Sequence, residues 1–134
     1  MIPSLEVTSS WKQPKTATTP ERRGPVHMNL TNPRTPVAPV DADNELEIMQ
    51  RSVEAVRKQR EDPGQPMFIH LNHPNYVWGV TAEELMQIHH EKFFEIYNGR
   101  PGVHNAGDAT HLSNDEIWDV VLTRRLAELK LDVM

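Results

Sequence analysis

The feature that most constrains this chain is the segment Phe68–Asn75. It begins as an apolar, strand-like run and ends at two histidines and a proline. Strand side chains alternate between two faces, so His70 and His73 would point to opposite faces of an unbroken strand. Pro74 has no amide hydrogen to give to a sheet, so the strand should end near His73. Strand ends of α/β folds often carry functional side chains. The run therefore predicts a buried strand with a metal site at its tip.

Composition narrows the classes of partner. The chain has 134 residues, 37% hydrophobic and 25% charged, which is typical of one globular unit. The net charge is -5 and the basic residues are scattered, so we expect no nucleic-acid partner. No apolar run approaches the roughly 20 residues that cross a bilayer, and no signal-peptide pattern opens the chain, so we expect no membrane association. Because cysteine is absent, a metal would be held by His, Asp and Glu.

Histidine is frequent in this chain, which has seven: His27, His70, His73, His89, His90, His104 and His111. Imidazole also serves as an ordinary surface or hydrogen-bonded core side chain, so its frequency alone does not indicate a metal site. The candidate metal ligands among them must therefore be chosen by their position in the predicted strands and helices.

The first third of the chain reads as two strands joined by a loop. Residues 1–7 predict a short strand, and residues 8–25, rich in Ser, Thr, Pro and basic residues, predict a long exposed loop. Val26–Leu30 alternates apolar and polar residues, which predicts a second strand with His27 on its polar face.

The remaining patterns alternate helices with strands. Asp41 or Asp43 would cap a helix that runs to about Arg60, with an apolar stripe of Met49, Val53 and Val56. Capping boxes open further helices at Thr81 and Ser113, and between them Phe93–Tyr97 predicts a strand. The last helix would bury one side made of Trp118, Val121, Leu122, Leu126 and Leu129.

Strands that alternate with helices predict a parallel sheet or barrel of βαβ units. Apolar strand-like residues stand at both ends of the chain, including Leu131–Met134. We therefore expect the chain to be the central part of a larger α/β domain, spanning residues 1–134.

Three segments carry a resemblance to a known family: His70–Gly79, Phe93–Gly99 and Val103–Asp108. They resemble the polymerase-and-histidinol-phosphatase (PHP) superfamily, and more narrowly the bacterial PHP-domain metallohydrolases, including the carbaryl-hydrolase-like branch. The resemblance implies an α/β fold, a partial distorted (β/α)7 barrel of PHP type that lacks its first and last strands. It also implies divalent metal ions, zinc, manganese or iron, at the strand ends.

The resemblance also implies site residues. Ser4-Leu5-Glu6 stands where the family has a Gly-x-Glu pattern, so Glu6 would be a metal ligand that bridges ions, although serine replaces the glycine. His27 and His73 match two further ligand histidines, and Glu6 and His73 are the predicted catalytic residues. The function implied is a metal-dependent hydrolase, in the first place a phosphoesterase acting on a small-molecule phosphoester or related ester.

The rest of the family's ligand set is missing. The amino-terminal His-x-His pair, another histidine and the carboxyl-terminal Asp-x-His have no counterpart at matching positions. The isolated chain is therefore expected to hold an incomplete site. The alternative is a non-catalytic barrel fragment or interaction module that binds no metal.

Five further residues are candidates for substrate contact: His70, Tyr76, Asn98, Arg100 and His104. His70 is equally compatible with a structural role, and a solvated loop position is the simpler explanation for Arg100.

Overall fold

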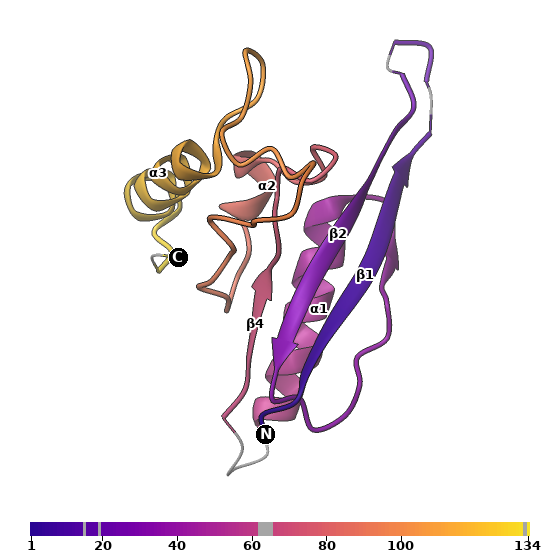
Figure 1. The fold of residues 1–134 in the computed structure, drawn as a ribbon, viewed down its shortest axis with the longest axis vertical. Coiled ribbons are helices and arrows are strands. Elements are labelled where there is room, and N and C mark those ends of the chain that lie inside the picture. Colours follow the sequence, from indigo (N-terminus) through magenta and orange to yellow (C-terminus); the bar gives the residue numbers. More distant parts are fainter. Residues whose placement is uncertain (15, 19, 62–65, 133) are drawn as a thin grey trace.

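The fold is built on one sheet of four strands. The structure, a computed structural model, describes residues 1–14, 16–18, 20–61, 66–132 and 134. The strands are β1 (Ser4–Gln13), β2 (Arg22–Thr31), β3 (Asp41–Ala42) and β4 (Phe68–Leu71), and their order in the sheet is β3-β1-β2-β4 (Figure 1). β1 pairs antiparallel with β2, β2 pairs antiparallel with β4, and β3 lies parallel to β1. The sheet is therefore mixed and open.

The two faces of the sheet differ in polarity because of strict alternation. The buried side chains described on the three longer strands are those of Val7, Ser9, Trp11, Val26, Met28, Leu30, Ile69 and Leu71. Pairing sets Glu6 opposite Asn29, and Asn29 opposite His70, so these three side chains share the other face. One face of the sheet thus forms the core, and the other carries polar side chains.

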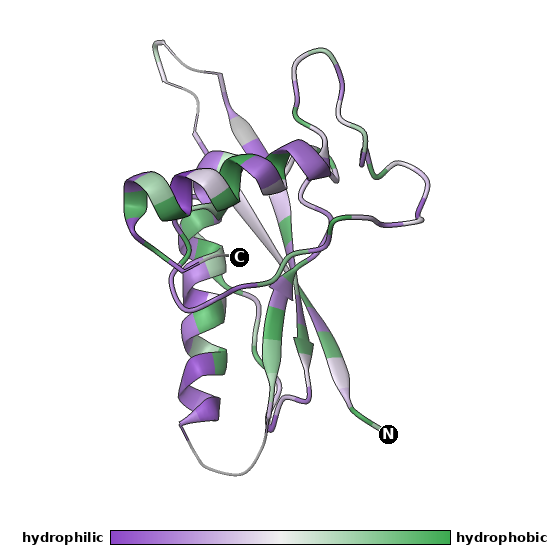
Figure 2. Cartoon of the chain, turned by 90° about the vertical axis from the view of Figure 1, so that its left-hand side faces the viewer, coloured by the Kyte–Doolittle hydropathy of each residue, from purple (hydrophilic) through white to green (hydrophobic). Residues whose placement is uncertain are grey.

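Helix α1 (Glu45–Arg60) covers the apolar face, running behind β1 and β2 in Figure 1. Asn44 caps the helix, because its side chain accepts a hydrogen bond from the backbone amide of Glu47 at 2.9 Å. Met49, Val53 and Val56 are buried, as their helical spacing predicts. The colouring in Figure 2 shows the hydrophobic residues of α1 as a discontinuous stripe along an otherwise polar helix.

Two further helices lie beyond β4 (Figure 1). They are α2 (Ala82–Leu85) and α3 (Asn114–Arg124), and α3 continues into the π-helical turn η1 (Arg125–Leu129). Capping boxes open both α2 and α3, at Thr81 and Ser113, as predicted. Their buried apolar residues, Leu85, Ile117 and Val121, join the same core as the sheet and α1.

The predicted partial (β/α)7 barrel is wrong. The sheet is not closed, and its two longest strands form an antiparallel hairpin rather than a βαβ unit. The predicted loop 8–25 is also partly strand: β1 continues to Gln13, and β2 begins at Arg22. The expected strand Phe93–Tyr97 is reduced to an isolated parallel bridge between Leu71 and Phe94.

The predicted buried side of the last helix is only partly present. Val121 is buried, whereas Trp118 is 42% exposed and Leu126 is 54% exposed. The residue buried beside Val121 is Ile117, one position before the tryptophan. No strand forms in the described part of the segment Leu131–Met134, and Val133 lies outside the described residues.

Within the described ranges, no helix combines the length and the apolar character that a membrane span requires.

Candidate metal centre

Three side chains converge on the polar face of the sheet: Glu6, His27 and His73. Each offers one ligand atom, and these atoms all lie within 4.8 Å of one another. Glu6 comes from β1 and His27 from β2, where they are diagonal neighbours, since Glu6 pairs with Asn29 and Thr8 with His27. His73 comes from the loop after β4. Sheet pairing thus joins residues 67 positions apart in the sequence, from Glu6 to His73.

The end of β4 explains how His73 reaches this face. The last pairing residue of β4 is Leu71, and the amide of Asn72 then donates to the carbonyl of His27 at 2.8 Å. His73 turns away from the strand with a φ of 23°, in the left-handed region that side chains disfavour. The strand therefore ends between His70 and His73, as the proline predicted, and His73 swings towards His27.

The carboxylate of Glu6 is held at one oxygen. The side-chain amide of Asn72 donates to Oε2 of Glu6 at 2.6 Å. The other oxygen, Oε1, lies 3.6 Å from Nδ1 of His27, which is too long for a hydrogen bond. The Glu6 side chain is 47% exposed, so the cluster opens to solvent on the polar face.

One ring nitrogen of His27 is buried and has no hydrogen-bond partner within the part of the chain that the structure describes. Among the described residues, its Nδ1 is one of few buried side-chain atoms without a hydrogen-bond partner. Burial, and then the charge of His73, lower the pKa of His27 below its ordinary value, while Glu6 acts in the opposite direction. A lowered pKa favours the neutral ring, whose lone pair is what binds a metal ion.

The donor set fits one divalent ion. Two imidazoles and one carboxylate are a known catalytic zinc set, which leaves a fourth position for water. In tetrahedral geometry, ligands at about 2.0–2.1 Å from zinc are about 3.3–3.4 Å apart. The separation of 3.6 Å between Oε1 of Glu6 and Nδ1 of His27 is close to that value, and all three ligand atoms lie within 4.8 Å of one another.

The aromatic ring of Tyr76 closes one side of the cluster. Its centroid lies 5.6 Å from that of His27 and 5.3 Å from that of His73. The guanidinium of Arg100 lies 5.4 Å from the centre of the Tyr76 ring. Two of the predicted substrate residues therefore border the cluster, and Arg100 puts a positive charge beside it.

The other three predicted substrate residues have different surroundings. The ring of His70 stacks on Phe68 at 5.9 Å, and burial lowers its pKa. Asn98 uses its side-chain amide to bind both carboxylate oxygens of Glu95, at 3.0 and 3.1 Å. His104 is exposed and stacks on Trp78, with centroids 4.6 Å apart. None of the three contributes an atom to the group of candidate ligands.

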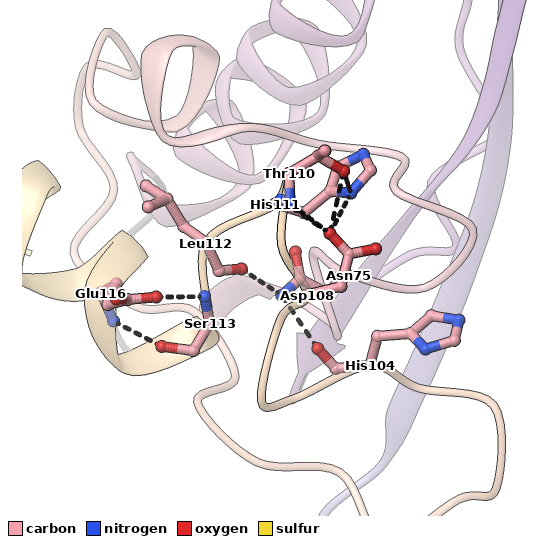
Figure 3. A network of polar contacts seen from close by, with 8 residues as sticks. All are labelled: Asn75, His104, Asp108, Thr110, His111, Leu112, Ser113 and Glu116. Carbon is pink, nitrogen blue, oxygen red and sulfur yellow. Dashed lines mark hydrogen bonds and ion pairs between the residues drawn. The ribbon is translucent and has the colours of Figure 1, made fainter.

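A polar network organises the loop before α3 (Figure 3). The side-chain amide of the buried Asn75 donates to the carbonyls of His104, at 3.0 Å, and Leu112, at 2.8 Å. Oδ1 of Asp108 accepts hydrogen bonds from the amide of Thr110 at 2.7 Å and from the amide of His111 at 2.9 Å. These bonds, the Thr110 amide first, lower the pKa of the Asp108 carboxyl. These bonds hold the loop before α3 together and tie it to Asn75.

A larger cavity lies away from the candidate ligands. It measures about 490 Å³ and lies between the β1–β2 hairpin, the Trp78 region and the loop at His111, with Trp11 and Arg23 in its wall. None of Glu6, His27 and His73 lines it. By contrast, the enclosed space between His27, His73 and Tyr76 is too small for a water molecule, so ligands would reach the cluster from the open polar face.

Sequence reasoning missed two residues that hold the cluster, Asn72 and Glu95. Both lie inside segments that carried the family resemblance, and both are polar residues next to apolar strand residues. Many other polar residues of the chain also lie next to apolar ones, so this position alone does not single them out.

Comparisons with models of known protein families, with curated proteins and with solved structures find no match to this chain. The family resemblance therefore remains a prediction from sequence motifs.

Proposed function

We propose that this chain binds one divalent metal ion through Glu6, His27 and His73, and that its function is metal-dependent hydrolysis of a small phosphoester or related ester. The observation that carries the proposal is the buried, unpartnered Nδ1 of His27, which faces the free oxygen of Glu6 at 3.6 Å. Leaving a buried polar atom without a partner costs about 1–3 kcal/mol. A bound cation would satisfy it.

In this proposal the three ligands hold the ion and Arg100 contacts the substrate. Oε1 of Glu6 and the neutral rings of His27 and His73 hold the ion, while Oε2 of Glu6 stays bonded to Asn72. When bound, such an ion lowers the pKa of a water molecule from about 16 towards 7 and offsets negative charge on the substrate. Arg100, beside Tyr76, offers a second positive charge to an anionic phosphoryl group.

Metal binding is tested first, because hydrolysis depends on it. Purified protein is stripped with a chelator and titrated with zinc and then manganese by calorimetry, and its metal content is measured by elemental mass spectrometry. We expect one ion per chain in the wild type, and at least about tenfold weaker binding in Glu6→Gln and His73→Ala. His90→Ala, at an exposed histidine five residues after the end of α2, is the matched control and should bind like the wild type.

Activity is tested second, with p-nitrophenyl phosphate and bis-p-nitrophenyl phosphate in the presence of manganese. Turnover that is lost in His73→Ala and kept in His90→Ala supports the proposal. Equal zinc binding in wild type and His73→Ala would refute the metal site. A wild type that binds neither metal would favour the non-catalytic interaction module instead.

A further inference from the structure

A carboxylate that is not among the candidate ligands holds the backbone of one of them. The backbone amide of His73 donates to Oε2 of Glu95 at 2.8 Å. His73 has left the sheet at this point, so no strand partner takes its amide hydrogen. A hydrogen bond to an ionised carboxylate is shorter and stronger than one between neutral groups. Glu95 therefore takes the place of a strand partner at His73, the residue whose φ is positive.

Glu95 is itself placed by the backbone. Its amide donates to the carbonyl of Leu71 at 2.8 Å, and the amide of Leu71 donates to the carbonyl of Phe93 at 3.3 Å. These two bonds lay residues 93–95 beside the end of β4. Glu95 thus lies one residue past the bridge between Leu71 and Phe94, and its side chain reaches the amide of His73.

The carboxylate of Glu95 is also bound by the side chain of Asn98. Nδ2 of Asn98 donates to both of its oxygens, and Oδ1 of Asn98 accepts from the amide of Arg100 at 2.8 Å. Asn98 is held in turn by Asn105, whose Nδ2 donates to the Asn98 carbonyl at 2.8 Å and whose Oδ1 accepts from the Asn98 amide at 3.0 Å. The amide of Asn114, at the start of α3, donates to the carbonyl of Asn105 at 2.9 Å. A chain of amides therefore anchors Glu95 to a helix.

We infer that Glu95 is a positioning residue for the metal centre: it holds the His73 backbone in its left-handed turn, and Asn98 holds Glu95. This inference rests on the proposed metal site. A residue that keeps His73 in place should raise the affinity for the ion without touching it, because a prearranged ligand need not be reordered when the ion binds. Asn98 then acts through Glu95, not on substrate.

The test compares three variants with the wild type by zinc titration and by hydrogen exchange of the His73 amide, measured by NMR. Glu95→Ala removes the acceptor, so the His73 amide should exchange faster and zinc should bind about 10–100-fold more weakly. Glu95→Gln keeps one acceptor oxygen but turns an amide towards Nδ2 of Asn98, so its loss should be intermediate. Glu61→Gln, an exposed glutamate at the end of α1, is the control for the same chemical change and should bind like the wild type.

The double variant Glu95→Gln/Asn98→Asp provides the rescue. The exchanged pair can again form one hydrogen bond between its side chains, one to the His73 amide and one to the Arg100 amide. We expect its zinc affinity and its amide protection to return to within about threefold of the wild type.

Two outcomes overturn the inference alone: wild-type zinc affinity in Glu95→Ala, or affinity that falls in a variant whose His73 amide stays protected. The second would make charge, not position, the cause. If the wild type itself binds no zinc, the proposed function fails and this inference fails with it. The measurements on the wild type and on Glu95→Ala thus separate the two failures.

Discussion

Asn72 donates a hydrogen bond from Nδ2 to Oε2 of Glu6 at 2.6 Å, which links the residue after β4 to β1 across the intervening strand β2. The bond occupies one oxygen of the carboxylate and leaves the other to face His27. Glu6 is half-exposed, so without this bond its side chain would be free to sample other rotamers.

Asn72→Ala should therefore weaken zinc binding by about tenfold, because the ligand oxygen of Glu6 loses its orientation. Calorimetric titration of the metal-free protein measures the change. Asn29→Ala is the matched control: Asn29 pairs with Glu6 in the sheet, but its side-chain oxygen accepts from Ser4 at 2.6 Å. An equal loss of affinity in both variants would contradict the role of Asn72.

Glu91 should make the folded state less stable as the pH rises from about 4.5. Its side chain is only 3% exposed, and burial raises its pKa above the ordinary value. Between the unfolded and the folded pKa the native state binds more protons than the unfolded chain, so the free energy of unfolding decreases with pH in that window. Above the folded pKa the decrease ends.

The measurement is urea unfolding of the wild type and Glu91→Gln between pH 4 and 7. The difference between the two isolates Glu91 from the half-buried His27 and His70, whose lowered pKa values act on stability over the neighbouring range. We expect the wild type to lose stability relative to Glu91→Gln as the pH rises. A constant difference would show that Glu91 titrates alike in both states.

Two glycines with positive φ should respond differently to alanine. At Gly102, with a φ of 87°, an added Cβ meets nothing within 4 Å, so Gly102→Ala should cost about 1–2 kcal/mol from backbone strain alone. At Gly107, with a φ of 66°, the Cβ would lie 2.4 Å from the carbonyl oxygen of His111. Gly107→Ala should therefore lower the free energy of unfolding, measured in urea, by about 1–3 kcal/mol more than Gly102→Ala does. An equal loss of stability in the two variants would mean that the loop at His111 moves to accept the added Cβ at no cost in free energy.

The inner face of α3 should be defined by Ile117 rather than by Trp118. Ile117 is 2% exposed and Trp118 is 42% exposed. Ile117→Ala should destabilise by about 2–5 kcal/mol, and Trp118→Ala by clearly less, although the tryptophan is larger. Thermal and urea unfolding of both variants decide the order, and the reverse order would place the tryptophan in the core.

The sequence predicted elements whose signals are local. Alternation marked Val26–Leu30, helical spacing marked the stripe of α1, and short capping motifs marked Thr81 and Ser113. In each case neighbouring residues in the chain carry the whole signal, so no long-range contact was needed.

The architecture depended on pairing, which the sequence pattern did not reveal. The second half of β1 alternates Thr8, Ser10 and Lys12 with Ser9 and Trp11, and so has too few apolar residues to read as a strand. Pairing with β2 stabilises it, and Gly24 leaves room for the Trp11 ring. The antiparallel hairpin that results is the reason that the predicted (β/α)7 barrel was wrong.

The candidate site shows the same contrast between residues with a local sequence signal and residues that only the fold reveals. Glu6, His27 and His73 were selected from strand ends and from a family resemblance, and the structure brings them together, although their role as metal ligands is still a prediction. Glu95 and Asn72 were missed because they act through a backbone amide and through another side chain, and such roles leave no spacing pattern in the sequence.

The antiparallel ladder of β1 and β2 runs without interruption from the pair Ser4 and Thr31 to the pair Gln13 and Arg22. A slip of β1 by a single residue would turn Glu6 under α1 and push Val7 and Trp11 into solvent. The packing between the sheet and α1 therefore fixes the register of β1, and this register places Glu6 beside His27 on the opposite face. Mutations that loosen this packing should alter the geometry of the cluster even where they lie out of reach of every one of its atoms.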